Sequence, residues 1–165
     1  MKRKAFGRSR FFQLYPLSLQ EIASDFLSVQ QLLPTLLVFG SYPQVFFSEA
    51  EQEKRLLLEH IRNAIISRFE PLQLRDDQGR LWENFCISER MKKLSCSNTF
   101  SSFYFWRTYD QQEIDLIEEN SSRLDAFEFK WGSKPVMAPK GFARHYPDAK
   151  FQTIMPENVY DFLMT

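Results

Sequence analysis

Three strand-like segments follow one another between residues 103 and 131, and they constrain the fold more than any other feature of the chain. Residues 103–108 are aromatic and apolar, 113–119 alternate apolar with charged positions, and 124–131 alternate aromatic with smaller or charged positions. Such alternation is typical of strands, because successive side chains point to opposite faces of a sheet. The two connecting segments have four residues each, which suits hairpin loops. The sequence therefore predicts an antiparallel meander of three strands.

Helical periodicity, with apolar residues three and four positions apart, predicts helices on both sides of these strands. In the first helix, Ser18 and Glu21 have the spacing of a capping box. Pro34 is expected to interrupt the apolar run 32–39, because proline lacks the amide hydrogen that a helix interior uses. A turn is expected at 40–43. The predicted helices cover residues 18–27, 48–67, 81–94, 139–145 and 156–162, and a fourth strand covers 150–154.

Length and composition limit the class of protein. The 165 residues leave room for one ordinary domain, or for one domain with a helical appendage, but not for two catalytic domains, and 44% of them are hydrophobic, which suffices for a folded core. No apolar run has the length of a membrane helix or the pattern of a signal peptide. Cys86 and Cys96 are too few for a disulfide framework or a zinc site. We therefore expect a cytoplasmic α+β protein with reduced thiols and no membrane partner.

The charges of the chain balance, with 21 Lys and Arg residues against 21 Asp and Glu residues. A nucleic-acid partner would therefore need a local basic patch rather than a global field. The candidate patch is the amino terminus, and the alternative is that these residues form an ordinary solvated terminus. Its basic residues are Lys2, Arg3, Lys4, Arg8 and Arg10.

Four side chains form a candidate catalytic group. Glu128 and Lys130 are two positions apart on a predicted strand, so they project from the same face. Asp115 lies on the preceding strand, and Glu83, on the helix before the sheet, could supply a further metal ligand. Carboxylates can hold Mg or Mn through oxygen, and an adjacent ammonium can stabilise charge on a phosphate. The alternative interpretation is a solvent-facing cluster of cross-strand ion pairs.

Three tryptophans also have two interpretations. Trp82, Trp106 and Trp131 could stack on nucleic-acid bases, but each lies in a periodic apolar element, which favours core packing.

Four short segments carry a resemblance to a known family. They are Leu-Trp-Glu-Asn-Phe at 81–85, Tyr-Phe-Trp-Arg-Thr at 104–108, Glu-Ile-Asp at 113–115 and Phe-Glu-Phe-Lys at 127–130. Together they resemble the carboxy-terminal region of predicted bacterial and archaeal AAA-type ATPases, the domain of unknown function 4143. That domain is similar to PD-(D/E)xK nucleases, which are restriction-endonuclease-like α/β sandwiches. The resemblance covers nearly all of the chain from residue 61 onward.

This resemblance implies an αβββαβ core and a role for each candidate residue. It makes Glu83 the acid on the helix, Asp115 the central metal ligand and Glu128 the second ligand. Lys130 becomes the lysine of the nuclease motif. The implied activity is metal-dependent hydrolysis of DNA or RNA, with Mg or Mn as the cofactor.

The amino-terminal part resembles another region of the same ATPases. Gly7 and Arg8, then 14–18 and 39–43, are similar to the end of the ATPase domain and its helical lid. The resemblance implies that residues 1–60 are a helical remnant of that region, that 61–165 form the nuclease-like domain, and that Arg8 contacts a phosphate.

The chain also departs from the family. It has no Gly-rich loop ending in Gly-Lys-Ser or Gly-Lys-Thr, so no ATP site is expected in it. The winged-helix segment that usually separates the lid from the nuclease-like domain is also missing, so the chain looks truncated relative to the family. The alternative function is therefore a catalytically inactive remnant that acts as a protein-interaction or regulatory module. Its partner would be a full-length ATPase homologue or a second copy, bound through the apolar face of helix 48–67.

Overall fold

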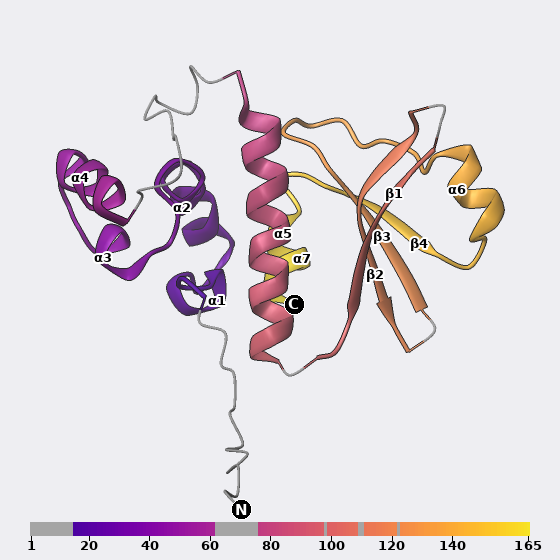
Figure 1. The fold of residues 1–165 in the computed structure, drawn as a ribbon, viewed down its shortest axis with the longest axis horizontal. Coiled ribbons are helices and arrows are strands. Elements are labelled where there is room, and N and C mark those ends of the chain that lie inside the picture. Colours follow the sequence, from indigo (N-terminus) through magenta and orange to yellow (C-terminus); the bar gives the residue numbers. More distant parts are fainter. Residues whose placement is uncertain (1–14, 62–75, 98, 109–110, 122) are drawn as a thin grey trace, which may run out of the picture.

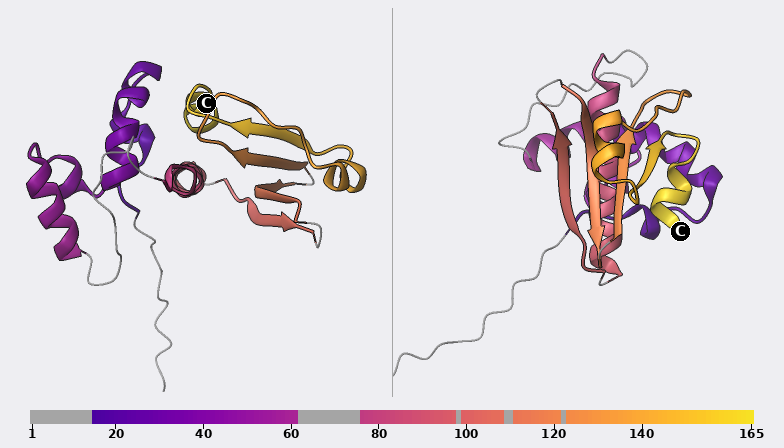
Figure 2. Two further views of the ribbon diagram at one scale, coloured as in Figure 1. Left: turned by 90° about the horizontal axis from the view of Figure 1, so that it is seen from above. Right: turned by 90° about the vertical axis from the view of Figure 1, so that its right-hand side faces the viewer.

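The computed structural model describes residues 15–61, 76–97, 99–108, 111–121 and 123–165. One long helix, α5 (Gln78–Cys96), runs through the middle of the molecule, with the amino-terminal helices on one side and a four-stranded sheet on the other (Figure 1). The fold is therefore α+β, as the sequence predicts. The left view of Figure 2 shows the same order of layers from above.

The predicted helix 18–27 is wrong in extent, because two helices share this region. Its start is confirmed: the amide and hydroxyl of Ser18 both donate hydrogen bonds to Glu21 Oε2, at 2.7 and 2.8 Å, and α1 spans Leu19–Ile22. Ala23 then adopts an extended conformation and ends α1. Asp25 caps the next helix, α2 (Phe26–Phe39), by accepting a hydrogen bond from the amide of Ser28 at 2.7 Å.

The expected break at Pro34 is also wrong, since this proline lies inside α2. A proline within a helix costs about 3 kcal/mol. Burial of the apolar face of α2, which includes Val29, Leu33 and Leu36, offsets this penalty, while Pro34 itself lies on the exposed face. The turn after the helix is confirmed, because Gly40 ends α2 with a φ of 73°, a conformation that favours glycine.

Two further helices precede α5 in the described part of the chain. They are α3 (Pro43–Phe46) and α4 (Glu51–Ile61). The helix α4 confirms part of the prediction for 48–67, and residues 62–67 lie outside the described part of the chain. Ser48 precedes α4, and its hydroxyl donates a hydrogen bond to Glu53 at 2.7 Å.

The predicted meander and the fourth strand are confirmed. The sheet has the order β1 (Ser102–Arg107), β2 (Glu113–Asn120), β3 (Arg123–Phe129) and β4 (Lys150–Ile154). The first three strands are antiparallel, and β4 runs parallel to β3. Two short helices, α6 (Lys140–His145) and α7 (Val159–Met164), flank β4 in sequence and confirm the two predicted carboxy-terminal helices.

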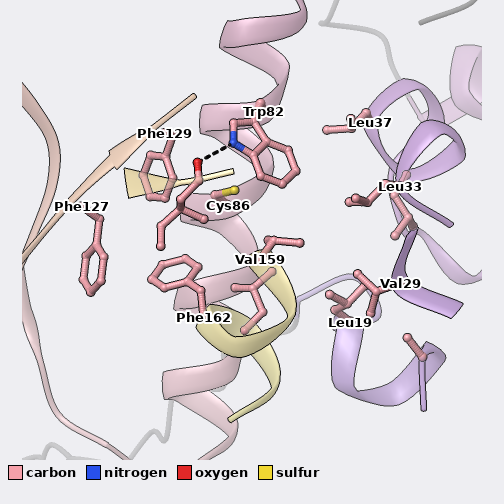
Figure 3. Close-up of a cluster of buried hydrophobic side chains, with 14 of the residues drawn as sticks. Leu19, Val29, Leu33, Leu37, Trp82, Cys86, Phe127, Phe129, Val159 and Phe162 are labelled. Atoms are coloured by element: carbon pink, nitrogen blue, oxygen red, sulfur yellow. Dashed lines mark hydrogen bonds between the residues drawn. The ribbon is translucent and has the colours of Figure 1, made fainter. Parts of the chain in front are cut away.

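One apolar core connects all three layers. In Figure 3, Trp82 and Cys86 of α5 lie between leucines of the amino-terminal helices and the phenylalanines of β3. Trp82 is fully buried, and its indole Nε1 donates a hydrogen bond to the carbonyl of Ile154 at 3.1 Å. The described residues of both predicted parts, 1–60 and 61–165, therefore share this core.

A buried ion pair on α5 attaches the amino-terminal helices to it. Glu89 and Lys92 form a 2.6 Å salt bridge with nearly no solvent exposure. The amide of Leu19 donates a hydrogen bond to the carboxylate of Glu89 at 2.7 Å. Lys92 Nζ donates two hydrogen bonds, to the carbonyl of Leu17 at 3.0 Å and to the hydroxyl of Ser41 at 2.9 Å. Because every charge in this group has polar partners, the network fixes the position of α1 and the end of α2 against α5.

A smaller apolar cluster covers the opposite face of the sheet. It consists of Ile114, Ile117 and Ala126 under Phe142 of α6. Trp106 packs edge-on against Phe142, with ring centroids 5.6 Å apart.

Candidate functional site

The carboxyl end of β3 carries two of the predicted site residues. Glu128 Oε1 and Lys130 Nζ are 2.7 Å apart, while Phe127 and Phe129 enter the main core from the other face of the strand. This confirms the predicted pairing of Glu128 with Lys130. Glu128 is buried and Lys130 is partly exposed. Burial lowers the pKa of Lys130, but the hydrogen bond to Glu128 and the attraction of neighbouring carboxylates raise the pKa overall.

Asp115 lies in a β-bulge of the neighbouring strand. Tyr104 pairs with Ile117 and Trp106 pairs with Ile114, so two steps along β1 correspond to three along β2. Consistent with an extra residue at this point, Ile114 and Ile117 pack in the same cluster, although strict alternation would place them on opposite faces. Bulges redirect side chains, and this one determines where the carboxylate of Asp115 points.

The bulge brings Asp115 against the end of β3. Leu116 pairs with Phe127, and continuing this register places Asp115 level with Glu128. The Asp115 carboxylate accepts a hydrogen bond from the amide of Phe129, with 2.7 Å between Oδ2 and N. The side chain of Asp115 on β2 is thus bonded to the backbone of β3 at Phe129, the residue between Glu128 and Lys130.

Burial and repulsion both act on the Asp115 carboxyl group. Burial, the largest cause, and the nearby carboxylates of Glu128 and Glu83 together raise its pKa to about 6, although the Phe129 amide and Lys130 oppose the shift. Glu83 is supplied by α5. The structure therefore brings the other three predicted site residues within electrostatic range of the Asp115 carboxyl group.

One oxygen at this site has no partner. Glu128 Oε2 is buried and accepts no hydrogen bond from the described residues. A buried, unsatisfied carboxylate oxygen is costly, so it marks a position that a cation or a donor could stabilise. Oxygen donors of this kind suit Mg or Mn.

The carboxylates do not form a three-ligand cage. Within the described ranges, no three His, Cys, Asp or Glu side chains are close enough together to hold one metal ion. Mg is commonly held by one or two carboxylates, with water and substrate phosphate completing its shell. The pair of Asp115 and Glu128, with the free Oε2, fits that coordination.

Other contributors to the site are visible only in the structure. The amide of Phe129 holds Asp115 in place, and no sequence pattern identifies a backbone donor. Glu113 attracts Lys130 from the start of β2. Cys86 lies under the site on α5, where burial, Glu89 and Asp115 raise the pKa of its thiol well above the ordinary value.

The remaining sequence candidates lie elsewhere. The basic amino terminus, including Arg8, is outside the described residues. Core packing is confirmed for Trp82, which is fully buried, and Trp106 and Trp131 are half-buried against the two apolar clusters. None of the helices in the described ranges is both long and apolar enough to cross a membrane.

Comparison with protein families finds a match. The family described as "Domain of unknown function (DUF4143)" matches residues 78–160, which is just over half of the chain. The chain belongs to the DUF4143 family. The matched region begins at α5 and contains the whole sheet, so the four site residues all belong to the DUF4143 domain. Comparison with curated proteins and with solved structures finds no match.

Proposed function

We propose that the DUF4143 domain of this chain hydrolyses phosphodiester bonds in DNA or RNA with the help of a divalent metal ion. The observation that carries this proposal is the pair of carboxyl groups at the ends of β2 and β3. Asp115 has a pKa raised to about 6, Glu128 has an unpartnered oxygen, and Lys130 lies beside them. Titratable groups with perturbed pKa values that gather at one point are typical of catalytic sites.

Asp115 and Glu128 are the proposed ligands for Mg or Mn. A divalent ion, when bound, would neutralise charge on the phosphate and lower the pKa of a water molecule. Glu83 adds negative charge from α5 and strengthens the attraction for a cation.

Lys130 is the proposed group that faces the substrate. Its side chain is partly exposed, and its raised pKa keeps the ammonium charged at neutral pH. A fixed ammonium next to a carboxylate can donate hydrogen bonds to a phosphate oxygen as negative charge builds up on it. Glu128 holds the ammonium in position through their 2.7 Å contact.

The finer assignment of the fold is part of the proposal. A helix, three antiparallel strands, a helix and a parallel fourth strand agree with the αβββαβ core of PD-(D/E)xK nucleases. By the same resemblance, we propose that α1 to α4 derive from the end and lid of an AAA-type ATPase, and that the protein acts in the cytoplasm of a prokaryote.

Cleavage assays test the proposal. Purified protein is incubated with plasmid DNA, single-stranded DNA or RNA, in the presence of Mg, Mn or a chelator. Cleavage is expected with a metal ion, and it should be lost in Asp115→Asn and in Lys130→Ala. The matched control is Glu119→Gln, because Glu119 is an exposed carboxylate on the same strand as Asp115 and accepts a hydrogen bond from the Tyr104 hydroxyl at 3.1 Å. Equal cleavage by wild type and Asp115→Asn would contradict the proposal.

A second candidate function is an inactive module that binds a full-length ATPase or another copy of the chain. Exposed apolar side chains next to and within α4 favour it: Phe47 is 71% exposed and Leu56 is 56% exposed. Its test is whether Leu56→Lys abolishes capture of a partner while metal-dependent cleavage remains absent.

A further inference from the structure

The strand β1 is an edge of the sheet. Among the described residues it pairs with β2 on one side and with no strand on the other, and it lies at the outer side of the sheet in the right-hand view of Figure 2. An edge strand presents unpaired amide and carbonyl groups that can pair with another strand. Proteins usually protect such edges with charged residues or proline, but β1 has only Arg107 as a charge and contains no proline.

Large apolar side chains gather at this edge. Phe100 is 94% exposed, Phe105 is 78% exposed and Tyr104 is 51% exposed. They lie within six consecutive residues, with Tyr104 and Phe105 in the middle of β1 and Phe100 two positions before the strand. Scattered apolar residues on a surface are ordinary, but a contiguous group next to an open strand edge marks an interaction surface.

We propose that β1 pairs with β1 of a second copy of this chain, in antiparallel orientation, to form a continuous eight-stranded sheet across a twofold axis. This inference concerns a surface separate from the carboxylate site and does not depend on the proposed catalysis. A symmetric interface uses the same patch on both copies, so the patch must be complementary to itself.

The sequence of β1 meets this condition. In an antiparallel pair, hydrogen-bonded and non-hydrogen-bonded residue pairs alternate along the strands. A twofold axis preserves this alternation only if it passes between one residue and the same residue of the second copy. With the axis at Phe105, the two Phe105 side chains are neighbours, Tyr104 faces Trp106, and Phe103 faces Arg107. These are aromatic pairs and a cation-aromatic pair, which stabilise neighbouring strands. No position places like charges opposite each other.

Part of the area that such an interface needs is already exposed. A buried aromatic side chain removes about 150–250 Å² from water, so the exposed parts of Tyr104 and Phe105 supply roughly 250 Å² for each copy. A stable interface of standard size buries about 800 Å² for each partner. The two rings thus account for about a third of that area, and the strand backbone with its flanking side chains supplies the remainder.

Sedimentation velocity of the full chain tests the pairing. The wild type is expected to be a dimer at micromolar concentration. Phe105→Lys places two like charges against each other at the axis, and it should weaken dimerisation by at least roughly tenfold. Phe105 is largely exposed, so this variant should keep the circular dichroism spectrum of the wild type. The matched control, Leu27→Lys, changes an exposed apolar residue at the start of α2 and should leave the dimer intact.

A covalent probe confirms the register. In a Cys96→Ser background, which removes the exposed native thiol, Phe105→Cys is expected to form a disulfide between copies under mild oxidation. Facing residues of antiparallel strands have Cα atoms about 4.5–5.5 Å apart, which is within the range of a disulfide. A wild type that stays monomeric at high micromolar concentration would overturn the proposal. So would a dimer that Leu56→Lys dissociates and Phe105→Lys does not.

Discussion

The amide of Phe129 donates a 2.7 Å hydrogen bond to the carboxylate of Asp115. This bond places a half-buried acid of β2 between the two charged residues at the end of β3. The amide stabilises the ionised form of Asp115, while burial, Glu128 and Glu83 destabilise it, and the balance raises its pKa to about 6. The site therefore holds a carboxylate that is ionised at neutral pH in surroundings that disfavour its charge. A divalent cation would relieve this conflict.

Removal of the Asp115 charge should stabilise the fold. Asp115→Asn keeps an oxygen that can accept the Phe129 amide, but it removes a desolvated negative charge near Glu128 and Glu83. Solvent screens part of this penalty because the group is only half-buried. We expect a gain of about 1 kcal/mol at neutral pH, or roughly 2–4 °C in Tm. A thermal melt without metal ions measures it, and a fall in Tm would contradict the electrostatic account.

The same group predicts a pH dependence of stability. The folded pKa of Asp115 is about 6 and its ordinary value is 3.8, so between these values the folded state binds more protons than the unfolded state. The contribution of Asp115 to the free energy of unfolding therefore falls as pH rises through this window. Urea unfolding of wild type and Asp115→Asn should give similar stabilities near pH 4. Above about pH 6 the variant should be the more stable, and a constant difference at all pH values would contradict the assignment.

Metal binding should make the wild type more stable than Asp115→Asn at neutral pH. An ion that binds only the folded state stabilises it by about 2.7 kcal/mol at a hundred times its dissociation constant. Mg or Mn is therefore expected to raise the Tm of wild type and of Glu119→Gln, but to have little effect on Asp115→Asn or Glu128→Gln. Equal shifts in all four proteins would place the bound ion elsewhere.

The buried pair of Glu89 and Lys92 should contribute strongly to stability. Lys92→Met leaves Glu89 buried without its cation, which typically costs about 3–5 kcal/mol. The control is Arg80→Met, because Arg80 is largely exposed and its nearest contact with Asp77 is 4.0 Å, so its loss should cost less than about 0.5 kcal/mol. Chemical denaturation measures both changes, and similar values would show that the network does not attach α1 and α2 to α5.

The sheet and α5 could be predicted from the sequence because their periodicity is strong and their turns are local. Alternation of Phe127 with Glu128 is sufficient to assign β3 and both of its faces. The amino-terminal helices were harder, because burial of the α2 core face overrides the local effect of Pro34. Tertiary packing of this kind is not visible in a single sequence.

The residues of the candidate site could be predicted from the sequence, but their arrangement in space could not. The residues Glu83, Asp115, Glu128 and Lys130 could be named from strand spacing and family resemblance. The bulge in β2 and the amide of Phe129 could not, because an extra residue in a ladder has no distinct pattern of residue types here. The link from Glu89 to Leu19 joins positions 70 residues apart, so no local pattern identifies it.

Location of a bound metal ion tests the central claim most directly. Crystals of the wild-type protein soaked in Mn are expected to show an anomalous scattering peak within about 2.5 Å of carboxylate oxygens of both Asp115 and Glu128. The same soak of Asp115→Asn crystals should show no peak there. A fully occupied Mn site elsewhere, with these two carboxylates unbound, would contradict the proposed ion site.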